Sequence, residues 1–256
     1  MKPLAGRVAL VTGASRKIGI AAAICRRLAS DGADIAFTHF SPYDVTMYDT
    51  PVSEPDEIRE ELLAMGVRVH AASADFSQPG VAGPIFDEVT AALGPVDILI
   101  NTAAWSTHDA WDTLTEESMD KHLSVNARAT AMLTVEFARR FEKGESGRVI
   151  AFSSGQHLGA MPGELAYAAS KGAIIAFCTS ISPDLAGLGI TINVINPGPT
   201  DTGWIGDELR EAIVRNSPQG RVGMPEDTAR LVAWLVSDEA GWVTGQVIDS
   251  EGGLRR

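Results

Sequence analysis

The stretch RVALVTGASRKIG, residues 7–19, joins an apolar run to a glycine-bearing turn and decides the fold. Arg7 to Val11 predicts a strand, and the Ala- and Leu-rich segment Ile18 to Ser30, which Asp31-Gly32 stops, predicts the helix that follows. The turn between them, Thr12 to Gly19, therefore lies at a helix N-terminus, where backbone N–H groups and the helix dipole attract an anion. A pyrophosphate is the ligand that suits such a turn best, and a plain chain reversal is the alternative.

Six more short apolar runs recur between longer segments of helical spacing. The early ones are continuous rather than alternating, as in strands that helices cover on both faces, and the alternation of strand with helix implies parallel pairing. These observations predict a single α/β domain over residues 1–256, a doubly wound Rossmann fold whose seven-stranded parallel sheet is flanked by helices. The further strands are expected at Asp34 to Phe37, Val67 to Ala72, Val96 to Ile100, Arg148 to Phe152, Thr191 to Ile195 and Val247 to Asp249.

Composition narrows the class of protein. The chain has 256 residues, 45% of them hydrophobic, which suits one sizeable core. Its 21 basic and 33 acidic residues give a net charge of -12, which argues against nucleic-acid and membrane partners. Cys25 and Cys178 lie too far apart in the chain for a disulfide framework or a metal-ligand spacing. No uncharged stretch approaches the length of a membrane span, and the N-terminal apolar run is too short for the core of a signal peptide. We therefore expect a cytoplasmic protein without a metal.

Two long segments carry helical patterns. Apolar residues recur near a 3.6-residue period from Glu116 to Phe141, after a capping Thr115. The segment Leu165 to Leu185 is rich in Ala, Ser and Gly, and small residues allow another helix to approach closely. This second helix either packs against another subunit, giving a homodimer or homotetramer, or packs tightly within the monomer alone.

One stretch, Ser41 to Pro55, reads as irregular. It holds Pro42, Pro51 and Pro55 together with Tyr43, Met47 and Tyr48, between the second strand and the next helix. Long connections of this kind are either lids on the cofactor or substrate side of a site or plain surface excursions.

The residues near the turn also bear on the choice of dinucleotide. An enzyme specific for NAD usually places a carboxylate at the end of the second strand, where it binds the ribose 2′-hydroxyl. Here that strand ends in Thr38-His39-Phe40, while Arg16 and Lys17 stand in the turn, where a 2′-phosphate would meet cations. The sequence therefore favours NADP(H), with NAD(H) as the alternative, and His39 is either a cofactor contact or a partly exposed residue.

The most specific pattern is YAASK, residues 167–171. Tyr167 and Lys171 share one face of a helix, so that the ammonium can favour ionisation of a phenol whose unperturbed pKa of about 10 makes it a sluggish acid at neutral pH. Ser154 follows the strand Arg148 to Phe152, at the sheet edge where open parallel sheets bind ligands. From there its hydroxyl can donate a hydrogen bond to a substrate carbonyl.

On these motifs the sequence resembles, over essentially its whole length, the compact branch of the short-chain dehydrogenase/reductases, and most closely the 3-oxoacyl-acyl-carrier-protein reductases. The resemblance implies that Tyr167 is the general acid in reduction and that Ser154 holds the carbonyl. Lys171 would lower the phenol pKa and bind the nicotinamide ribose, and Asn126 would complete the tetrad by holding a proton-relay water. Two departures from the family pattern are Lys17, in place of the middle glycine of the turn, and Asn101-Thr102-Ala103-Ala104, in place of Asn-Asn-Ala-Gly.

The resemblance also implies the other contacts of the site. The cofactor contacts expected from the turn and from the family together are Gly13, Ser15, Arg16, Lys17, Ile18, Gly19, His39, Asp75, Phe76, Asn101, Ala103, Tyr167, Lys171, Pro197, Gly198, Thr200 and Thr202. The candidate substrate contacts are Trp105, His157, Met161 and Trp204, while for Glu164 solvent exposure is the favoured interpretation. Thr202 to Arg221 is expected to form a mobile flap.

The function expected from this reading is an NADP-preferring oxidoreductase that moves hydride between nicotinamide and a carbonyl or secondary alcohol, with Tyr167 as general acid/base and activity like that of a 3-oxoacyl-acyl-carrier-protein reductase. The alternatives are an NAD-linked sugar, steroid or alcohol dehydrogenase of the same family and a non-catalytic dinucleotide sensor. A net charge of -12 opposes docking of an acidic carrier protein unless a local basic patch exists, and Arg128, Arg139 and Arg140 are candidates for one.

Overall fold

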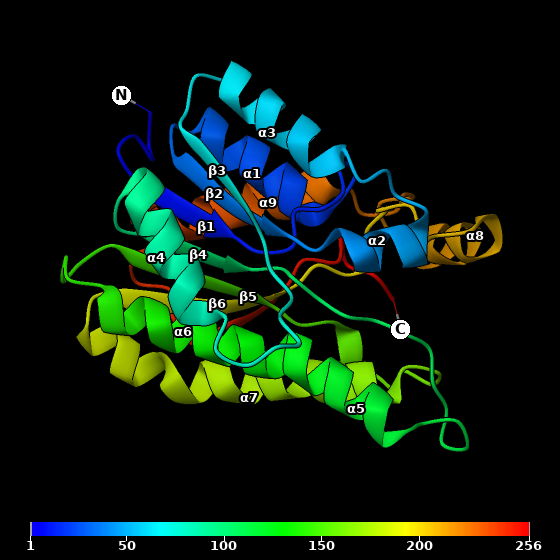
Figure 1. Ribbon diagram of the computed structural model, residues 1–256. Helices are drawn as coiled ribbons and strands as arrows, with labels where there is room; N and C mark the ends of the chain where they lie inside the picture. The colour runs from blue at the N-terminus through cyan, green and yellow to red at the C-terminus, as the bar shows by residue number, and fades with distance from the viewer. Residues whose placement is uncertain (1, 256) are drawn as a thin grey trace.

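The computed structural model describes residues 2–255, and its strands form one parallel sheet in the order β3-β2-β1-β4-β5-β6-β7 (Figure 1). Every neighbouring pair is parallel, and the sheet is flanked by helices, so the predicted fold class is confirmed. Each strand begins or ends within two residues of its predicted position. The strands are β1 Val8–Val11, β2 Asp34–His39, β3 Val69–Ser73, β4 Ile98–Asn101, β5 Gly147–Phe152, β6 Ile190–Asn196 and β7 Val247–Asp249.

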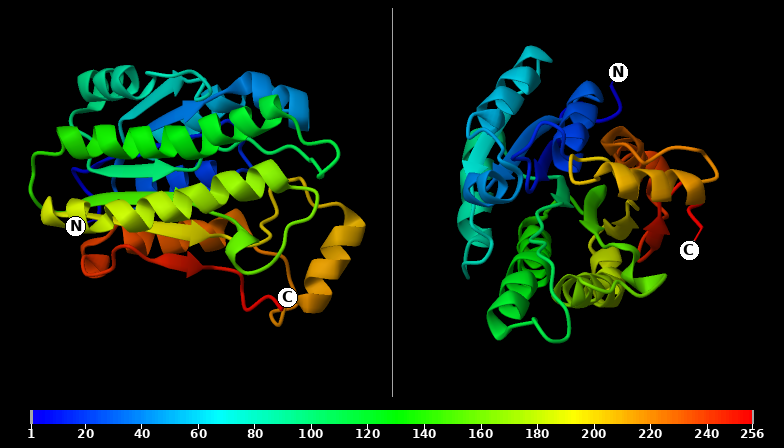
Figure 2. Two further views of the ribbon diagram at one scale, coloured as in Figure 1. Left: turned by 90° about the horizontal axis from the view of Figure 1, so that it is seen from below. Right: turned by 90° about the vertical axis from the view of Figure 1, so that its right-hand side faces the viewer.

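Helices cover both faces of the sheet. Within β1, Ala9 and Val11 join the hydrophobic cluster beneath α1, α3 and α9, whereas Val8 and Leu10 join the cluster beneath α4, α6 and α7. Because successive strand residues point to opposite faces, a strand buried on both sides must be apolar throughout. The helices that form the two layers are α1 Ile20–Ser30, α3 Glu54–Ala64 and α9 Pro225–Leu235 on one face, and α4 Ala82–Leu93, α5 Glu116–His122, α6 Ala129–Arg140 and α7 Leu165–Gly187 on the other (Figure 2).

The helix predicted from Glu116 to Phe141 is present, with one irregularity. Thr115 caps it by accepting a hydrogen bond from Ser118 N at 3.1 Å. Between α5 and α6 the chain forms a wider π turn, Leu123–Arg128. Turns of this kind frequently occur at functional sites, and this one carries Asn126, which is fully buried.

The stretch Ser41 to Pro55 is not irregular as predicted, because most of it is helical. Helix α2 spans Ser41–Tyr48 and ends at Asp49, whose φ of 51° is left-handed, and α3 begins at Glu54. Pro42 and Pro55 lie in the first turns of these two helices, where a missing N–H costs nothing. Both α2 and the second short helix α8, Asp207–Asn216, lie at the end of the molecule where the strands have their carboxyl ends (Figure 1).

Helix α7 is long and apolar enough to cross a bilayer by length and composition alone. It nevertheless packs along the sheet, with a buried stripe that includes Ala166, Ser170, Ile174 and Cys178 and contacts to β5 and β6. These are the features of a core helix. Its outer face exposes Ala169, Ala176 and other apolar residues, which keeps the second-subunit interpretation as a prediction.

We expect the protein to sediment as a dimer or tetramer, and Ala176→Glu to dissociate it, because a carboxylate would then be buried between closely packed helices. Analytical ultracentrifugation would measure this. The matched control is Ala92→Glu, at an exposed position of α4. A wild-type protein that sediments as a monomer would contradict the interface on α7.

Candidate active site

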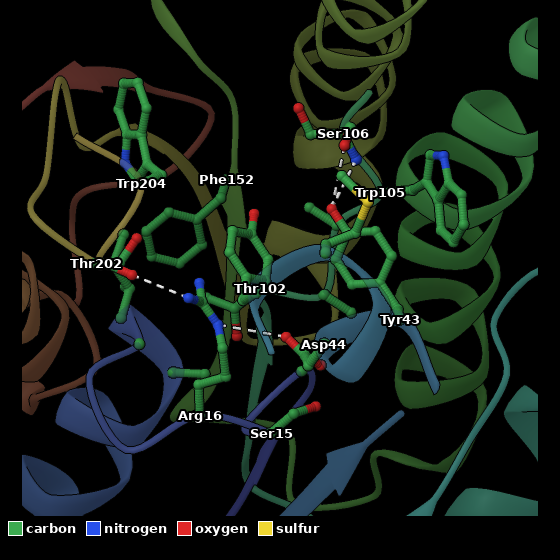
Figure 3. A pocket seen from close by; sticks show the side chains of 18 of the residues that line it. Ser15, Arg16, Tyr43, Asp44, Thr102, Trp105, Ser106, Phe152, Thr202 and Trp204 are labelled. Atoms are coloured by element: carbon green, nitrogen blue, oxygen red, sulfur yellow. Dashed lines mark hydrogen bonds and ion pairs between the residues drawn. The ribbon is translucent and has the colours of Figure 1, made fainter. Parts of the chain in front are cut away.

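A cleft of about 1270 Å³ opens at the carboxyl ends of the strands. Typical small-molecule pockets measure roughly 300–1,000 Å³, so this one has room for a large ligand together with a second, smaller one. The β1–α1 turn, α2 and the segments that follow β4, β5 and β6 form its walls, as Figure 3 shows in part. The predicted site residues that line it are Gly13, Ser15, Arg16, Ile18, Gly19, His39, Asp75, Phe76, Ala103, Trp105, Ser154, Met161, Glu164, Tyr167, Lys171, Pro197, Gly198, Thr200, Thr202 and Trp204.

The glycine turn is held against the segment after β4. Gly13 has a φ of +78°, and a Cβ at this position would lie 2.7 Å from the Cα of Ala103, so only glycine fits. Next to it, Thr12 Oγ1 accepts hydrogen bonds from the N–H groups of Thr102 and Ala103, each at 3.0 Å. Helix α1 then starts after Gly19 with no side chain capping its N-terminus. The turn therefore presents helix N–H groups to the cleft, as an anion site requires.

Lys17 does not enter the cleft. Its Nζ forms an ion pair with Glu57 Oε2 at 2.8 Å, and its backbone N–H donates to Glu54 Oε2 at 2.5 Å. Among the non-glycine residues of 2–255, positive φ occurs only at Asp49 and Ser146, so lysine replaces the middle glycine of the turn without left-handed strain. The predicted contact between Lys17 and the cofactor is thus not formed by this geometry.

Arg16 is the cation of the turn that projects into the cleft. Its Nη1 donates to the carbonyl of Thr202 at 2.9 Å, and its Nε lies 3.3 Å from Asp44 Oδ1, as Figure 3 shows. The ring of Tyr48 stacks on the guanidinium, 3.7 Å from Cζ to the ring centroid. Asp44 and Tyr48 both come from α2, which is therefore a wall of the site and not a plain surface excursion.

The Tyr–Lys pair faces the same cleft as the turn. Tyr167 and Lys171 lie one helical turn apart on α7, and Lys171 Nζ is 5.5 Å from the centroid of the phenol ring. The ammonium donates a hydrogen bond to the carbonyl of Phe152 at 2.9 Å, at the end of β5. Ser154, two residues beyond, lines the cleft beside them. The sheet thus brings together the three residues predicted to act on a carbonyl.

The pKa of Tyr167 is raised, whereas the sequence predicts that Lys171 lowers it. Desolvation by burial raises the pKa of Tyr167 to about 12, and hydrogen bonding with Ser154 opposes that shift. Burial likewise lowers the pKa of Lys171 to about 8. Loss of hydration is the largest cause of both shifts, and the phenol is protonated at neutral pH. This is the form from which a proton can be donated.

Asn126 and Asn101 are buried outside the lining of the cleft. The Oδ1 of Asn126 accepts from Trp105 N at 2.7 Å, and its Nδ2 donates to Trp105 O at 2.9 Å and to Ser170 Oγ at 2.8 Å. Asn126 therefore positions the segment after β4 against α7. Asn101 donates to Thr134 Oγ1 at 3.3 Å from within the core and is not among the residues that line the cleft, so its contact with the cofactor stays a prediction.

Three of the candidate substrate contacts, Trp105, Met161 and Trp204, line the cleft, and Tyr43 packs against Trp105 with ring centroids 4.6 Å apart. The fourth, His157, is not among the lining residues, and its Nε2 lies 3.0 Å from Asp249 Oδ1. The sequence singled out Tyr43 and Tyr48 only as members of an irregular stretch. Pro42, which suits the first turn of a helix, is the signal in the sequence that could have indicated α2.

The flap expected from Thr202 to Arg221 contains α8, and its Ile205 and Ile213 form a small apolar cluster with Val222, the residue that follows the flap. It is tied to the rest of the site by the bond from Arg16 to Thr202. The mobility of this segment stays a prediction.

Comparison with known proteins places the chain in a family. A family model described as enoyl-(acyl carrier protein) reductase matches residues 13–255. The chain is 50% identical to the uncharacterized oxidoreductase YjdA of Bacillus subtilis, over 98% of this chain and 97% of the relative. It is 38% identical to an NADPH-dependent aldehyde reductase-like chloroplastic protein of Arabidopsis thaliana, over 98% of this chain and 95% of the relative.

A solved structure agrees with these matches. The crystal structure of a short-chain dehydrogenase from Burkholderia cenocepacia in complex with NADP superposes with a TM-score of 0.88 and 34% identity, covering 98% of both chains. The chain therefore belongs to the short-chain dehydrogenase/reductase family, and it is an oxidoreductase. The resemblance to the short-chain dehydrogenase/reductases seen in the sequence is confirmed.

We expect Lys171→Met to raise the free energy of unfolding at pH 7 by roughly 2 kcal/mol, because folding disfavours the buried ammonium. The gain should shrink as the pH rises from 8 to 10.5, since over this range the folded lysine has lost its proton and the unfolded one has not. Urea denaturation across this pH range would measure it. Lys2→Met, at an exposed lysine, is the charge control, and a gain that does not change with pH would contradict the assignment.

Proposed function

We propose that the protein is an NADP-preferring carbonyl reductase that moves hydride between nicotinamide and the carbonyl of a small, neutral aldehyde or ketone. One observation carries the proposal: Tyr167, Ser154 and Lys171 face the same cleft as the glycine turn and Arg16. The printed names of the Arabidopsis relative and the Burkholderia structure, which mention NADPH and NADP, support the choice of cofactor.

The residues of the cleft fit a phosphorylated dinucleotide. Gly13 leaves room where a side chain would collide with Ala103, the uncapped start of α1 offers N–H groups to a pyrophosphate, and Arg16 supplies a cation. When bound, NADPH supplies the hydride. Asp75 and Phe76 would lie beside the adenine, and Thr200 and Thr202 beside the carboxamide, as the family resemblance implies.

The protein's own residues then handle the carbonyl oxygen. Ser154 donates a hydrogen bond that polarises the carbonyl, and the protonated phenol of Tyr167 donates its proton to the same oxygen. The ammonium of Lys171, held by the carbonyl of Phe152, stabilises the phenolate that this transfer leaves behind. Asn126 keeps Trp105 and α7 in register with one another.

The charges around the cleft include both signs, which supports a neutral substrate. Glu164 lines it close enough to raise the pKa of Tyr167, in addition to the larger effect of burial, and Lys121 lines it with its Nζ 4.8 Å from the centroid of the Trp105 ring. The candidate basic patch is paired with neighbours: Arg140 contacts Asp87 at 2.6 Å and Glu136 at 2.7 Å, Arg139 lies 3.8 Å from Glu136, and Arg128 donates to the carbonyl of Ser77 at 2.6 Å. An acidic carrier protein would find little net positive charge there.

Reduction of a 3-oxoacyl group on an acyl carrier protein is the second candidate function. The description of the matching family model, which names an acyl-carrier-protein substrate, favours it. A cytoplasmic location is proposed for either reaction, and the two buried, unpaired cysteines support it.

We expect NADPH to be consumed with small neutral aldehydes or ketones, and Tyr167→Phe to lower turnover at least a thousandfold while the Kd for NADPH changes less than about threefold. Loss of absorbance of the reduced cofactor measures turnover, and fluorescence titration measures Kd. Acetoacetyl-acyl-carrier protein in the same panel tests the second candidate. Tight NADPH binding without turnover of any carbonyl would indicate a sensor instead.

We expect Arg16→Ala to weaken NADPH at least tenfold and to change the affinity for NADH little, because only NADPH carries the 2′-phosphate. The matched control is Lys17→Ala, which removes a cation of the same turn that is paired with Glu57 outside the cleft. Equal losses for the two dinucleotides in Arg16→Ala would contradict the assignment.

A further inference from the structure

Helix α2 places a carboxylate, that of Asp44, next to the glycine turn, although the end of β2 itself has none. Strand β2 ends at His39, and the chain then turns through Phe40, whose N–H donates to Ser15 Oγ at 3.1 Å. This bond keeps the start of α2 beside the glycine turn. One turn into the helix, Asp44 lies 3.3 Å from the Nε of Arg16, so an acidic group stands next to the very cation expected to meet a 2′-phosphate (Figure 3).

The pair is shielded from water. The side chains of Arg16 and Asp44 are 14% and 13% exposed. Burial raises the pKa of Asp44, while a hydrogen bond from the Ser15 hydroxyl and the charge of Arg16 oppose that shift. An ion pair this far removed from solvent is weakened less by salt than a surface pair.

The guanidinium of Arg16 has its other sides occupied as well. Tyr48 covers one face, and the carbonyl of Thr202 accepts from Nη1. A phosphate that approaches Arg16 must therefore compete with Asp44 for the same donors, and its negative charge meets that of the carboxylate. A ribose 2′-hydroxyl meets no such repulsion, and it can donate a hydrogen bond to a carboxylate.

We propose that Asp44 is a specificity-determining residue that reduces the preference for NADPH over NADH which Arg16 confers. The inference deepens the proposed function, since it concerns the cofactor site of the same reaction. The site then has two opposed determinants, the cation of Arg16 from the glycine turn and the carboxylate of Asp44 from α2. The balance between them sets the ratio of Kd for NADH to Kd for NADPH.

The test is to titrate NADPH and NADH into the wild-type protein and into Asp44→Asn, which keeps the shape of the side chain and removes its charge. The ratio of Kd for NADH to Kd for NADPH should rise about tenfold, mainly because NADPH binds more tightly. In an Arg16→Ala background the same substitution should raise the ratio less than in the wild-type background, because the competition for the guanidinium is gone and only the direct effects of the carboxylate on the 2′-phosphate and the 2′-hydroxyl remain.

Asp56→Asn is the matched control. Because burial lowers the pKa of His39 and Asp56 is close enough to oppose that shift, Asp184→Asn serves as a second control: Asp184 is an exposed carboxylate near the C-terminal end of α7, so its loss changes the net charge equally and should change the ratio less than twofold. Helix α2 has no buried residue of its own, and its stability in each variant is checked by thermal melting. Asp44→Ser, with a shorter neutral side chain, should shift the ratio in the same direction as Asp44→Asn.

A ratio that is unchanged or lower in both Asp44 variants would overturn the proposal. A wild-type protein that binds NADH more tightly than NADPH would overturn the NADP preference of the proposed function, while a rise of the ratio in Asp44→Asn would still support the role of Asp44. Failure of all variants to bind either dinucleotide would overturn both.

Discussion

The close contact between Gly13 and Ala103 is the constraint on which the site depends. The strand order places β1 and β4 next to each other, while the connections that leave them run to opposite sides of the sheet. The cleft opens because these connections diverge. At its base, the hydroxyl of Thr12 accepts hydrogen bonds from Thr102 and Ala103 and so holds the glycine turn against the segment after β4. The other walls of the site, α2 and the segments after β5 and β6, surround this contact.

Desolvation decides the protonation states at the other end of the cleft. Lys171 is 3% exposed, and its hydrogen bond to the carbonyl of Phe152 replaces part of the lost hydration. The same dry surroundings keep the proton on Tyr167. When the phenol of Tyr167 loses its proton, the ammonium of Lys171 can stabilise the negative charge strongly, because the local dielectric constant is low.

Much of the fold and of the catalytic end could be predicted from the sequence, because both depend on local patterns. Apolar runs fixed the strands, and the spacing of Tyr167 and Lys171 on one helix fixed their common face. The positions of Lys17 and His157 could not be predicted, since each side chain contacts a residue distant in the chain, Glu57 for Lys17 and Asp249 for His157. The sequence left open whether Ser41 to Pro55 forms a lid or a surface excursion, and it did not indicate the helix α2 whose Asp44 and Tyr48 contact Arg16.

The apolar cluster of Ile205, Ile213 and Val222 is separate from the two clusters that hold the sheet together. The segment around α8 consequently has a small core of its own, against which Leu254 from the C-terminal end also packs. Its first residues belong to the cleft, because Thr202 accepts a hydrogen bond from Arg16 and Trp204 lines the wall. Exchanging Asp207–Asn216 for the corresponding helix of a relative, with Thr202 and Trp204 retained, is therefore a route to an altered substrate range.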